Sequence, residues 1–552
     1  MKKCCFLVLY FFFLPIYTYG QVYPKNFFRS PVDIKVAIAG TFGELRKNHF
    51  HSGIDIKTKQ KINIPIYAIQ DGYVSRIKVS SFGFGKTVYI NHENGFTSVY
   101  AHLENFADII EMRAQEEHYK KEKFEINFHL PKNEIKIKKG ELIGFSGNTG
   151  SSTAPHLHFE IRDTKTQKII NPMLFGFPIL DITHPVINSI LIYHKNGTKE
   201  VLKTEKIKSG TYQIFEDVEI KDFFNIGVNT VDFLDAAPNK CGVYSIELYV
   251  NDTIFFRNKM ESFSFNETKY INSHIDYEYY INNGVKFQKC FLEKNNKLST
   301  NQTIKYDYIG TSLKEGRHNI KIIVKDSYLN STSLTFQVNL TKENLEIKKE
   351  KPKDYINSQQ VFEFKNDDIE IYIPNNSLYK DYPFGYQKDI DSLLTYPIYK
   401  IFDDSIPSHK PFIISIKIDS LKSDLRRKAI IVRLENDKMN YIKSKWQENK
   451  IIGQSNNFGK FTILIDSIKP IITIEEISND FILVKIKDEL SGIKKYRGEI
   501  DGKWVLMEYD FKTDILKYKR ENERKNKNQI LNLSVTDKVG NTQNLDIHFK
   551  ND

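Results

Sequence analysis

Residues 147–161, GNTGSSTAPHLHFEI, decide the fold of the N-terminal part of this chain. The first nine are turn formers, and the last six alternate between polar and apolar side chains. Successive side chains of a strand point to opposite faces of a sheet, so His156, His158 and Glu160 should share one face. The apolar residues between them would bury the other face against a core. The turn-forming entry is typical of a loop that brings backbone close to a bound substrate.

Two shorter segments carry further histidine and carboxylate side chains. In residues 49–55, HFHSGID, His51 and Asp55 are four positions apart around a glycine, which argues against a helix. From an extended or bent backbone, both side chains can face one ion. In residues 100–103, YAHL, His102 stands at the end of an alternating strand, where a histidine on its own is more often structural.

A zinc site explains why these residue types occur together. Catalytic zinc has three His, Asp or Glu ligands and keeps a fourth position open for water. The ion lowers the pKa of that water and polarises the scissile carbonyl, while a neighbouring imidazole can accept the proton or stabilise the oxyanion. Three ligands and two further histidines meet this requirement. Strand periodicity alone does not say which of His156 and His158 binds the metal.

At these residues the sequence resembles peptidase family M23, the lysostaphin/LytM-type zinc endopeptidases that cut peptide cross-links in bacterial cell wall. The family's H-x-G-x-D, Tyr-x-His-Leu and H-x-H motifs occur in the expected order at 51–55, 100–103 and 156–158. Further family landmarks are found at 65–74 and 137–144. The resemblance covers under a third of the chain and implies an N-terminal peptidase domain built on an antiparallel β-sheet.

The resemblance also implies the roles of the site residues. Carried over position by position, it makes one Zn²⁺ per chain the cofactor. The implied metal ligands are His51, Asp55 and His158. The implied catalytic pair is His102 and His156.

The sequence departs from the family pattern mainly by a long insertion at about residues 106–137, which leaves the substrate choice open. The first part, 106–124, has good helix formers and no Gly or Pro, which predicts a short helical insertion; a solvated loop is the alternative. Glu160 is expected either to orient an imidazole or to be exposed. His49 is expected to be structural, with a supporting role at the metal as the alternative, and His92 to lie in a turn.

The whole chain is predicted to be mostly β and multidomain. Its 552 residues exceed one hydrophobic core, and its 31 Tyr and 39 Phe favour pleated strands. Short strands separated by Gly, Asn and Asp turns suggest β-sandwiches. The expected parts are a signal peptide (1–20), an M23-type metallopeptidase domain (21–178), an Ig-like β-sandwich (183–340), a charged linker (342–353), a β-rich domain (355–465) and a second Ig-like β-sandwich (466–552). Strands followed by Asp326 and Asp537 hint at an internal similarity between the two sandwiches.

The N-terminus is typical of an export signal. Two lysines precede an apolar run at 4–16, and a small residue follows at position 20. The run is too short to span a bilayer comfortably, so we expect cleavage, with an uncleaved anchor as the alternative. The predicted location is the periplasm or cell envelope, with secretion as a further option, and the mature chain is not expected to span a membrane. Cys241 and Cys290 then remain, and whether they form a disulfide stays open.

The net charge and the motifs of the sequence limit the classes of binding partner that we expect. The net charge of +11 favours peptidoglycan or another anionic wall polymer. The sequence has no nucleic-acid-binding motif, so nucleic acid is not an expected partner. The C-terminal β modules would position the protein on the wall or on protein partners.

The predicted function is an exported, zinc-dependent endopeptidase that hydrolyses peptide bonds in peptidoglycan stems or cross-bridges by attack of a zinc-activated water. One alternative is a non-catalytic LytM-type scaffold or regulator of cell-wall hydrolases, which would be expected to have lost ligands. All five expected ligand and catalytic residues are present, which favours the enzyme. The other alternative is a zinc protease that acts on proteins.

Overall fold

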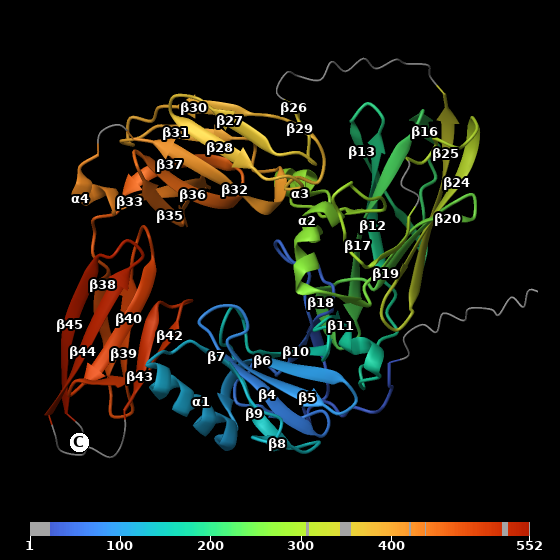
Figure 1. Cartoon of the computed structure of the whole chain (residues 1–552). Helices are drawn as coiled ribbons and strands as arrows, with labels where there is room; N and C mark the ends of the chain where they lie inside the picture. The colour runs from blue at the N-terminus through green and yellow to red at the C-terminus, as the bar shows by residue number, and fades with distance from the viewer. Residues whose placement is uncertain are drawn as a thin grey trace, which may run out of the picture.

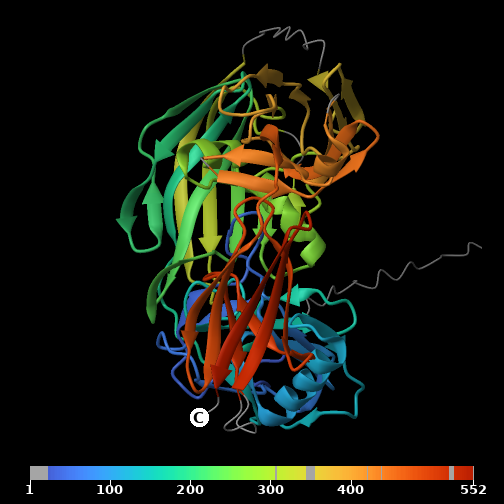
Figure 2. The same cartoon turned by 90° about the vertical axis from the view of Figure 1, so that its left-hand side faces the viewer.

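The computed structural model describes residues 23–304, 308–342, 355–418, 421–436, 438–520 and 528–550, so the predicted signal peptide and nearly all of the predicted linker lie outside the described residues. The described part is mostly β-strand with few helices, which confirms the predicted fold class. The elements gather around four large hydrophobic cores that follow one another along the chain. Figures 1 and 2 show the four resulting units in a ring, with the fourth beside the first.

The first unit is built on a large sheet whose central path runs β1-β2-β10-β6-β5-β4-β7, with antiparallel neighbours throughout. β10 shows the predicted alternation, because Leu157, Phe159 and Ile161 are fully buried in the core. The elements are β1 (Ile38–Gly40), β2 (Ile54–Lys57), β3 (Pro65–Tyr67), β4 (Gly72–Val79), β5 (Lys86–His92), β6 (Phe96–Phe106), α1 (Asp108–Lys121), β7 (Ile126–His129), β8 (Lys136–Ile137), β9 (Leu142–Ser146), β10 (His156–Asp163), β11 (Ile169–Ile170) and the 3-10 helix η1 (Pro172–Phe175).

The predicted helical insertion is confirmed as α1. Ile110 and Ala114, four residues apart on one face, are fully buried against the first core. The helix ends at Lys121 and is capped by Glu122, which has a left-handed backbone and donates its N–H to the carbonyl of Tyr119. The prediction for His92 is wrong: it lies in β5, where its ring contacts the carbonyl of Asp71 and the hydroxyl of Ser98.

The second unit consists of two facing sheets around one core. One sheet has the order β13-β12-β17-β18, and the other has the order β14-β15-β25-β24-β19-β20-β23. The elements are β12 (Val186–His194), β13 (Lys199–Lys203), β14 (Glu205–Lys208), β15 (Thr211–Gln213), β16 (Val218–Lys221), β17 (Phe224–Leu234), β18 (Ala237–Cys241), β19 (Ser245–Val250), β20 (Thr253–Lys259), β21 (Ser262–Phe263), η2 (Phe265–Tyr270), α2 (Ile271–His274), α3 (Tyr277–Asn283), β22 (Gln288–Lys289), β23 (Asn301–Ile304), β24 (Gly316–Lys325) and β25 (Ser331–Thr341).

The third unit also pairs two sheets, β27-β28-β32-β36-β35 and β30-β31-β37-β33-β34, around the third core. The elements are β26 (Tyr355–Ile356), β27 (Phe362–Lys365), β28 (Ile369–Ile373), β29 (Tyr382–Pro383), β30 (Tyr386–Asp389), β31 (Ile398–Ile401), β32 (Pro407–Lys417), α4 (Ser423–Arg426), β33 (Ala429–Glu435), β34 (Lys438–Ile442), β35 (Ser444–Gln447), β36 (Lys450–Asn457) and β37 (Gly459–Ile465).

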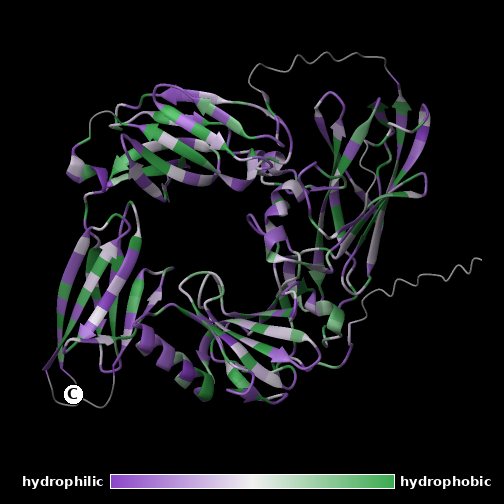
Figure 3. Ribbon diagram, in the orientation of Figure 1, coloured by the Kyte–Doolittle hydropathy of each residue, from purple (hydrophilic) through white to green (hydrophobic). Residues whose placement is uncertain are grey.

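The fourth unit has two four-stranded sheets, β38-β39-β43-β42 and β41-β40-β44-β45. Apolar and polar residues alternate along its strands, as Figure 3 shows by colour, and the apolar ones form the fourth core. The elements are β38 (Ile471–Ile477), β39 (Phe481–Lys487), β40 (Ile493–Ile500), β41 (Lys503–Val505), β42 (Met507–Asp510), β43 (Ile515–Lys519), β44 (Asn528–Asp537) and β45 (Thr542–Lys550).

The first and second units are packed closely together. β18 lies against β1, and Thr41 exchanges hydrogen bonds with the N–H and carbonyl of Gly242. Cys241 packs in the first core and Cys290 in the second, and both are free thiols. Among the described residues, no helix is long and apolar enough to cross a membrane.

Candidate metal centre

The metal-site prediction concerns three side chains, and the structure brings all three together. In the antiparallel pair β2–β10, Asp55 and His158 stand directly opposite each other. His51 precedes β2 in a loop whose flanking Phe42 and Phe50 are buried in a cluster shared with the second and third units. As a result His51 Nε2, Asp55 Oδ1 and His158 Nδ1 lie 3.0 Å from one another.

This donor set fits zinc. Two imidazole nitrogens and one carboxylate oxygen are ligands that zinc prefers, and bonds of ~2.0–2.1 Å in a tetrahedral site place ligand atoms about 3.3 Å apart. The 3.0 Å triangle is close to that spacing. The second nitrogen of each ring is held elsewhere, because His51 Nδ1 donates to the Thr41 carbonyl at 2.8 Å and His158 Nε2 donates to Glu160 at 3.1 Å. Each ring therefore presents its remaining nitrogen to one shared point.

Glu160 has the orienting role that the sequence left open. Its carboxylate is fully buried, and Arg162 holds the second oxygen with Nε at 2.7 Å and Nη2 at 2.5 Å. Burial raises the pKa of Glu160, but the Arg162 charge and the His158 contact outweigh burial and lower it to about 2. The ionised carboxylate thus holds Nε2 of His158, an arrangement that is common behind the histidine ligands of zinc sites. Arg162 continues the period-two pattern of β10, and that signal was available in the sequence.

Asp55 is oriented from its other side. Arg46 Nη2 donates to Asp55 Oδ2 at 3.1 Å, which leaves Oδ1 toward the two imidazoles. Burial raises the pKa of Asp55, but His51, His156 and His158 together hold it well below the usual range. Burial lowers the pKa of His158, whereas Asp55 and Glu160 raise it to about 9. The centre therefore carries ionised carboxylates that stabilise positive charge beside them.

His102 and His156 lie together at this centre. Their ring centroids are 4.9 Å apart, and His156 Nε2 is 3.4 Å from Asp55 Oδ1. Each Nδ1 is held by a backbone carbonyl at 2.8 Å, that of Thr149 for His102 and that of Ala154 for His156. With Nδ1 donating to Thr149, His102 keeps a lone pair on Nε2, whereas His156 Nε2 is directed toward the Asp55 carboxylate. Burial and the neighbouring imidazoles lower the pKa of His102 to about 3, so its ring is neutral at ordinary pH.

Two features of this geometry come from the backbone. His102 has a φ of 61°, in a bulge of β6, and the strand continues to Phe106 instead of ending at the histidine. Gly53 of the H-x-G-x-D motif lies against β10, where a Cβ would be 2.4 Å from the Phe159 carbonyl oxygen. The glycine is therefore needed for close contact between strands. His49 is exposed and bonds to Lys47 within its own loop, outside the centre.

The fourth unit contacts the loop that holds the two histidines. Lys512 Nζ donates to the carbonyls of Asn148 and Ser152. Nearby, Phe511 packs on Phe82 with ring centroids 4.1 Å apart. Sequence reasoning did not find this contact, because nothing local in residues 510–514 indicates a partner more than 350 positions away.

The helical insertion provides a second part of the same interface. Tyr119 of α1 packs edge-on against Trp504, and Glu122 pairs with Arg497 at 2.7 Å. An ion pair between buried Lys86 and half-exposed Glu508, at 3.0 Å, completes the contact.

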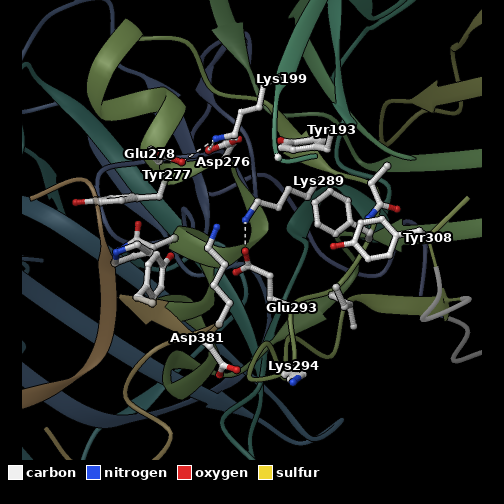
Figure 4. A pocket seen from close by; sticks show the side chains of 18 of the residues that line it. Tyr193, Lys199, Asp276, Tyr277, Glu278, Lys289, Glu293, Lys294, Tyr308 and Asp381 are labelled. Atoms are coloured by element: carbon white, nitrogen blue, oxygen red, sulfur yellow. Dashed lines mark hydrogen bonds and ion pairs between the residues drawn. The ribbon is translucent and has the colours of Figure 1, made fainter. Parts of the chain in front are cut away.

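A cavity of about 510 Å³ lies away from the metal centre, where the second unit meets the third. Figure 4 shows ion pairs in its lining, of Lys199 with Asp276 and Glu278, and of Lys289 with Glu293. These ion pairs join residues within the second unit, and the histidines discussed above are not part of the lining.

Comparison with known proteins finds a family match over the residues that form the metal centre. The sequence profile of peptidase family M23 matches residues 49–117 and 125–172, and that of the Zu5-like domain matches residues 353–466. The chain is 32% identical over 133 residues to the DD-carboxypeptidase/endopeptidase Mpg of Neisseria meningitidis, which covers 24% of each protein. It is 30% identical over 176 residues to the peptidoglycan DD-endopeptidase ShyA of Vibrio cholerae, which covers 29% of this chain and 35% of that protein.

The solved catalytic domain of lysostaphin from Staphylococcus simulans is 24% identical, covers 25% of this chain and 91% of that domain, and gives a TM-score of 0.20. The chain spans only about a quarter to a third of the length of the curated relatives it matches. The match to the family is therefore confined to the unit that contains the metal centre. Residues 49–117 and 125–172 of this chain thus match peptidase family M23, as the resemblance predicted.

Proposed function

We propose that this protein is an exported, zinc-dependent endopeptidase that hydrolyses peptide bonds in peptidoglycan stems or cross-bridges. The observation that carries the proposal is the converging set of His51, Asp55 and His158, with His102 and His156 beside it. Relatives named as peptidoglycan endopeptidases and the net charge of +11 support an anionic wall substrate. The export step rests on the sequence of residues 1–20.

The proposed roles follow from the hydrogen bonds of each ring. When zinc is bound to the three ligands, the chemistry it supplies is a more acidic water and a polarised substrate carbonyl. His102 is neutral, and its Nε2 can accept a proton because Nδ1 is held by Thr149. His156, held in the same way by Ala154, can carry a proton on Nε2 and donate it to the developing oxyanion.

The rest of the chain would act by positioning. We propose that the second and fourth units are Ig-like sandwiches that present the M23 domain to the wall or to protein partners. Arg162, Glu160 and Thr41 keep the ligands oriented whatever the substrate is. A non-catalytic scaffold would not need the fixed tautomers of His102 and His156, so their hydrogen bonds favour the enzyme.

The test is digestion of purified peptidoglycan by residues 21–552, with mass spectrometry of the released fragments. We expect muropeptides cut at a peptide bond, activity lost on chelation and restored by Zn²⁺, and no activity in Asp55→Ala. His49→Ala is the matched control, because His49 lies in the same segment but outside the centre. Digestion that survives chelation and Asp55→Ala would refute the metal mechanism. Zinc binding without digestion would indicate the non-catalytic scaffold. Cleavage of casein without digestion of peptidoglycan would indicate a protease that acts on proteins.

A further inference from the structure

Two triads of aspartates occupy equivalent places in the second and fourth units. The first triad is Asp181, Asp232 and Asp326, and the second triad is Asp466, Asp488 and Asp537. In each triad, one carboxylate oxygen from every member lies within 4.8 Å of the others. Neither triad belongs to the M23 centre.

The equivalence begins at the first strand of each unit. Asp181 is followed by Pro185 and by β12, and Asp466 is followed by Pro470 and by β38, at the same spacing. In each triad, the second aspartate directly follows the residue that pairs with the first residue of that strand (β12 or β38). Val186 pairs with Val231, which precedes Asp232, and Ile471 pairs with Lys487, which precedes Asp488.

The third aspartate of each triad starts the same turn at the end of a late strand: Asp326 directly follows β24, and Asp537 is the last residue of β44. Asp326 Oδ1 accepts from the N–H of Asn330, and Asp537 Oδ1 accepts from the N–H of Asn541. The two asparagines then reach back to the first aspartate of each triad. Asn330 Nδ2 donates to the Asp181 carbonyl at 3.1 Å, and Asn541 Nδ2 donates to the Asp466 carbonyl at 3.0 Å. In both units, the same asparagine hydrogen bond thus holds the segment that leads into the first strand.

These hydrogen bonds leave buried oxygens without a partner. Asp181 Oδ2, Asp232 Oδ1 and Asp466 Oδ1 are buried and accept no hydrogen bond from the described residues. Asp232 and Asp466 are each only 1% exposed. Burying an unpaired carboxylate is strongly unfavourable unless a cation or a proton compensates it.

The chain itself supplies little positive charge. None of the six carboxylates pairs with a Lys, Arg or His in the described part of the chain within 4 Å, although Lys428 approaches the second triad through Asn541 Oδ1. Burial, followed by the like charge of Asp326, raises the pKa of Asp232 to about 8. Burial and the two other carboxylates also raise the pKa of Asp488.

We propose that each triad is a binding site for one divalent cation of the calcium class. Carboxylate and backbone oxygens without nitrogen or sulfur ligands suit hard cations, and the larger, more flexible coordination of Ca²⁺ suits three converging carboxylates better than that of Mg²⁺. The ion joins the segment that enters a unit to two strands of that unit. It therefore fixes the angle at which the second unit follows the first, and the fourth follows the third.

The first triad is also connected to the metal centre. Asp232 pairs with Cys241 at the end of β18, and the next residue, Gly242, hydrogen-bonds with Thr41. The Thr41 carbonyl in turn holds His51 Nδ1. An ion at the first triad stiffens the strand pair that supports a ligand of the M23 centre.

The experiment measures bound calcium on the full mature chain. Protein stripped with EGTA and reloaded with one equivalent of Zn²⁺ is dialysed against CaCl₂ or MgCl₂, and bound metal is counted by mass spectrometry alongside the thermal midpoint. We expect two Ca²⁺ per chain, one in Asp232→Asn, one in Asp466→Asn and none in the double variant. Asp252→Asn, in an exposed turn, should keep two. Calcium should raise the midpoint of the parent and leave that of the double variant unchanged.

Other outcomes overturn the proposal. If the parent chain binds no calcium, the triads are protonated structural clusters. If the double variant retains two calcium ions, the ions bind elsewhere. Preference for Mg²⁺ over Ca²⁺ refutes the calcium class. Misfolding does not obscure the result, because replacing an unpaired buried charge with Asn should not lower the midpoint of calcium-free protein. Asp181→Asn provides a second variant of the first triad, with the same expected loss of one ion.

Discussion

Replacing Glu160 with glutamine tests whether the buried carboxylate behind His158 sets the affinity for zinc. The carboxylate accepts from His158 Nε2 on one oxygen and from Arg162 on the other. A glutamine offers one acceptor oxygen and an NH₂ group, so either His158 or Arg162 then faces a donor. Both side chains are buried and cannot turn to water for replacement.

The expected effect has two parts. Loss of an outer-shell partner of a metal-ligating histidine weakens metal binding about 10–100-fold. Removal of one partner of a buried charge pair costs about 3–5 kcal/mol, because the Arg162 guanidinium keeps no matching anion. We therefore expect Glu160→Gln to bind zinc one to two orders of magnitude more weakly and to unfold at lower urea concentration.

The assay is competition for zinc against a chromophoric chelator, with urea unfolding measured on the zinc-free protein. Asp163→Asn is the matched control: it lies in the same strand, accepts hydrogen bonds from Thr166 in an exposed turn, and should leave zinc affinity unchanged. The reasoning is refuted if Glu160→Gln binds zinc within twofold of the parent while remaining folded. A double variant, Glu160→Gln with Arg162→Gln, should recover part of the stability but not the zinc affinity.

Three other changes have defined outcomes. Gly53→Ala places a Cβ 2.4 Å from a backbone oxygen of β10 and should cost about 1–3 kcal/mol in urea unfolding. Gly385→Ala is the control: its Cβ would meet the Cα of Phe402 at 3.7 Å, so this variant should unfold like the parent. Burial lowers the pKa of His274 to about 4. The unfolded ring gains its proton near pH 6.5, so stability should be full above pH 6.5 and fall by about 3 kcal/mol down to pH 4, and His274→Gln should lose this part of the pH dependence. Lys512→Met removes donors to loop 147–155, whose amide exchange should rise roughly two- to tenfold, whereas Lys503→Met should not change it.

The strand at 156–161 could be predicted from the sequence because one face is buried and the other is polar. Period two then determines which side chains meet, and His156, His158 and Glu160 do share a face at the centre. The assignment of His158, and not His156, as the implied ligand came from the family resemblance. In the structure His158 Nδ1 lies 3.0 Å from both His51 Nε2 and Asp55 Oδ1, and its assignment as a metal ligand stays a prediction.

Other parts of the site could not be predicted from the sequence. The groups that fix three of the rings are the backbone carbonyls of Thr41, Thr149 and Ala154, and any residue type offers such a carbonyl. The positive φ of His102 arises from a bulge against β5, which depends on register and not on the local sequence. The triads were visible only as strands followed by an aspartate, because their members are brought together by folding.

The fourth unit contacts the first within one chain, and the covalent connection between them affects how strong their contact needs to be. The interface rests on a few groups, among them the pairs Lys86–Glu508, Tyr119–Trp504 and Phe82–Phe511. Two separate proteins would lose translational and rotational freedom on forming such a contact. Here the chain already holds the partners together, and a tether of this kind gives an effective local concentration that reaches the millimolar range for short flexible linkers. A contact too weak to detect between separate domains can therefore remain closed for most of the time within one molecule.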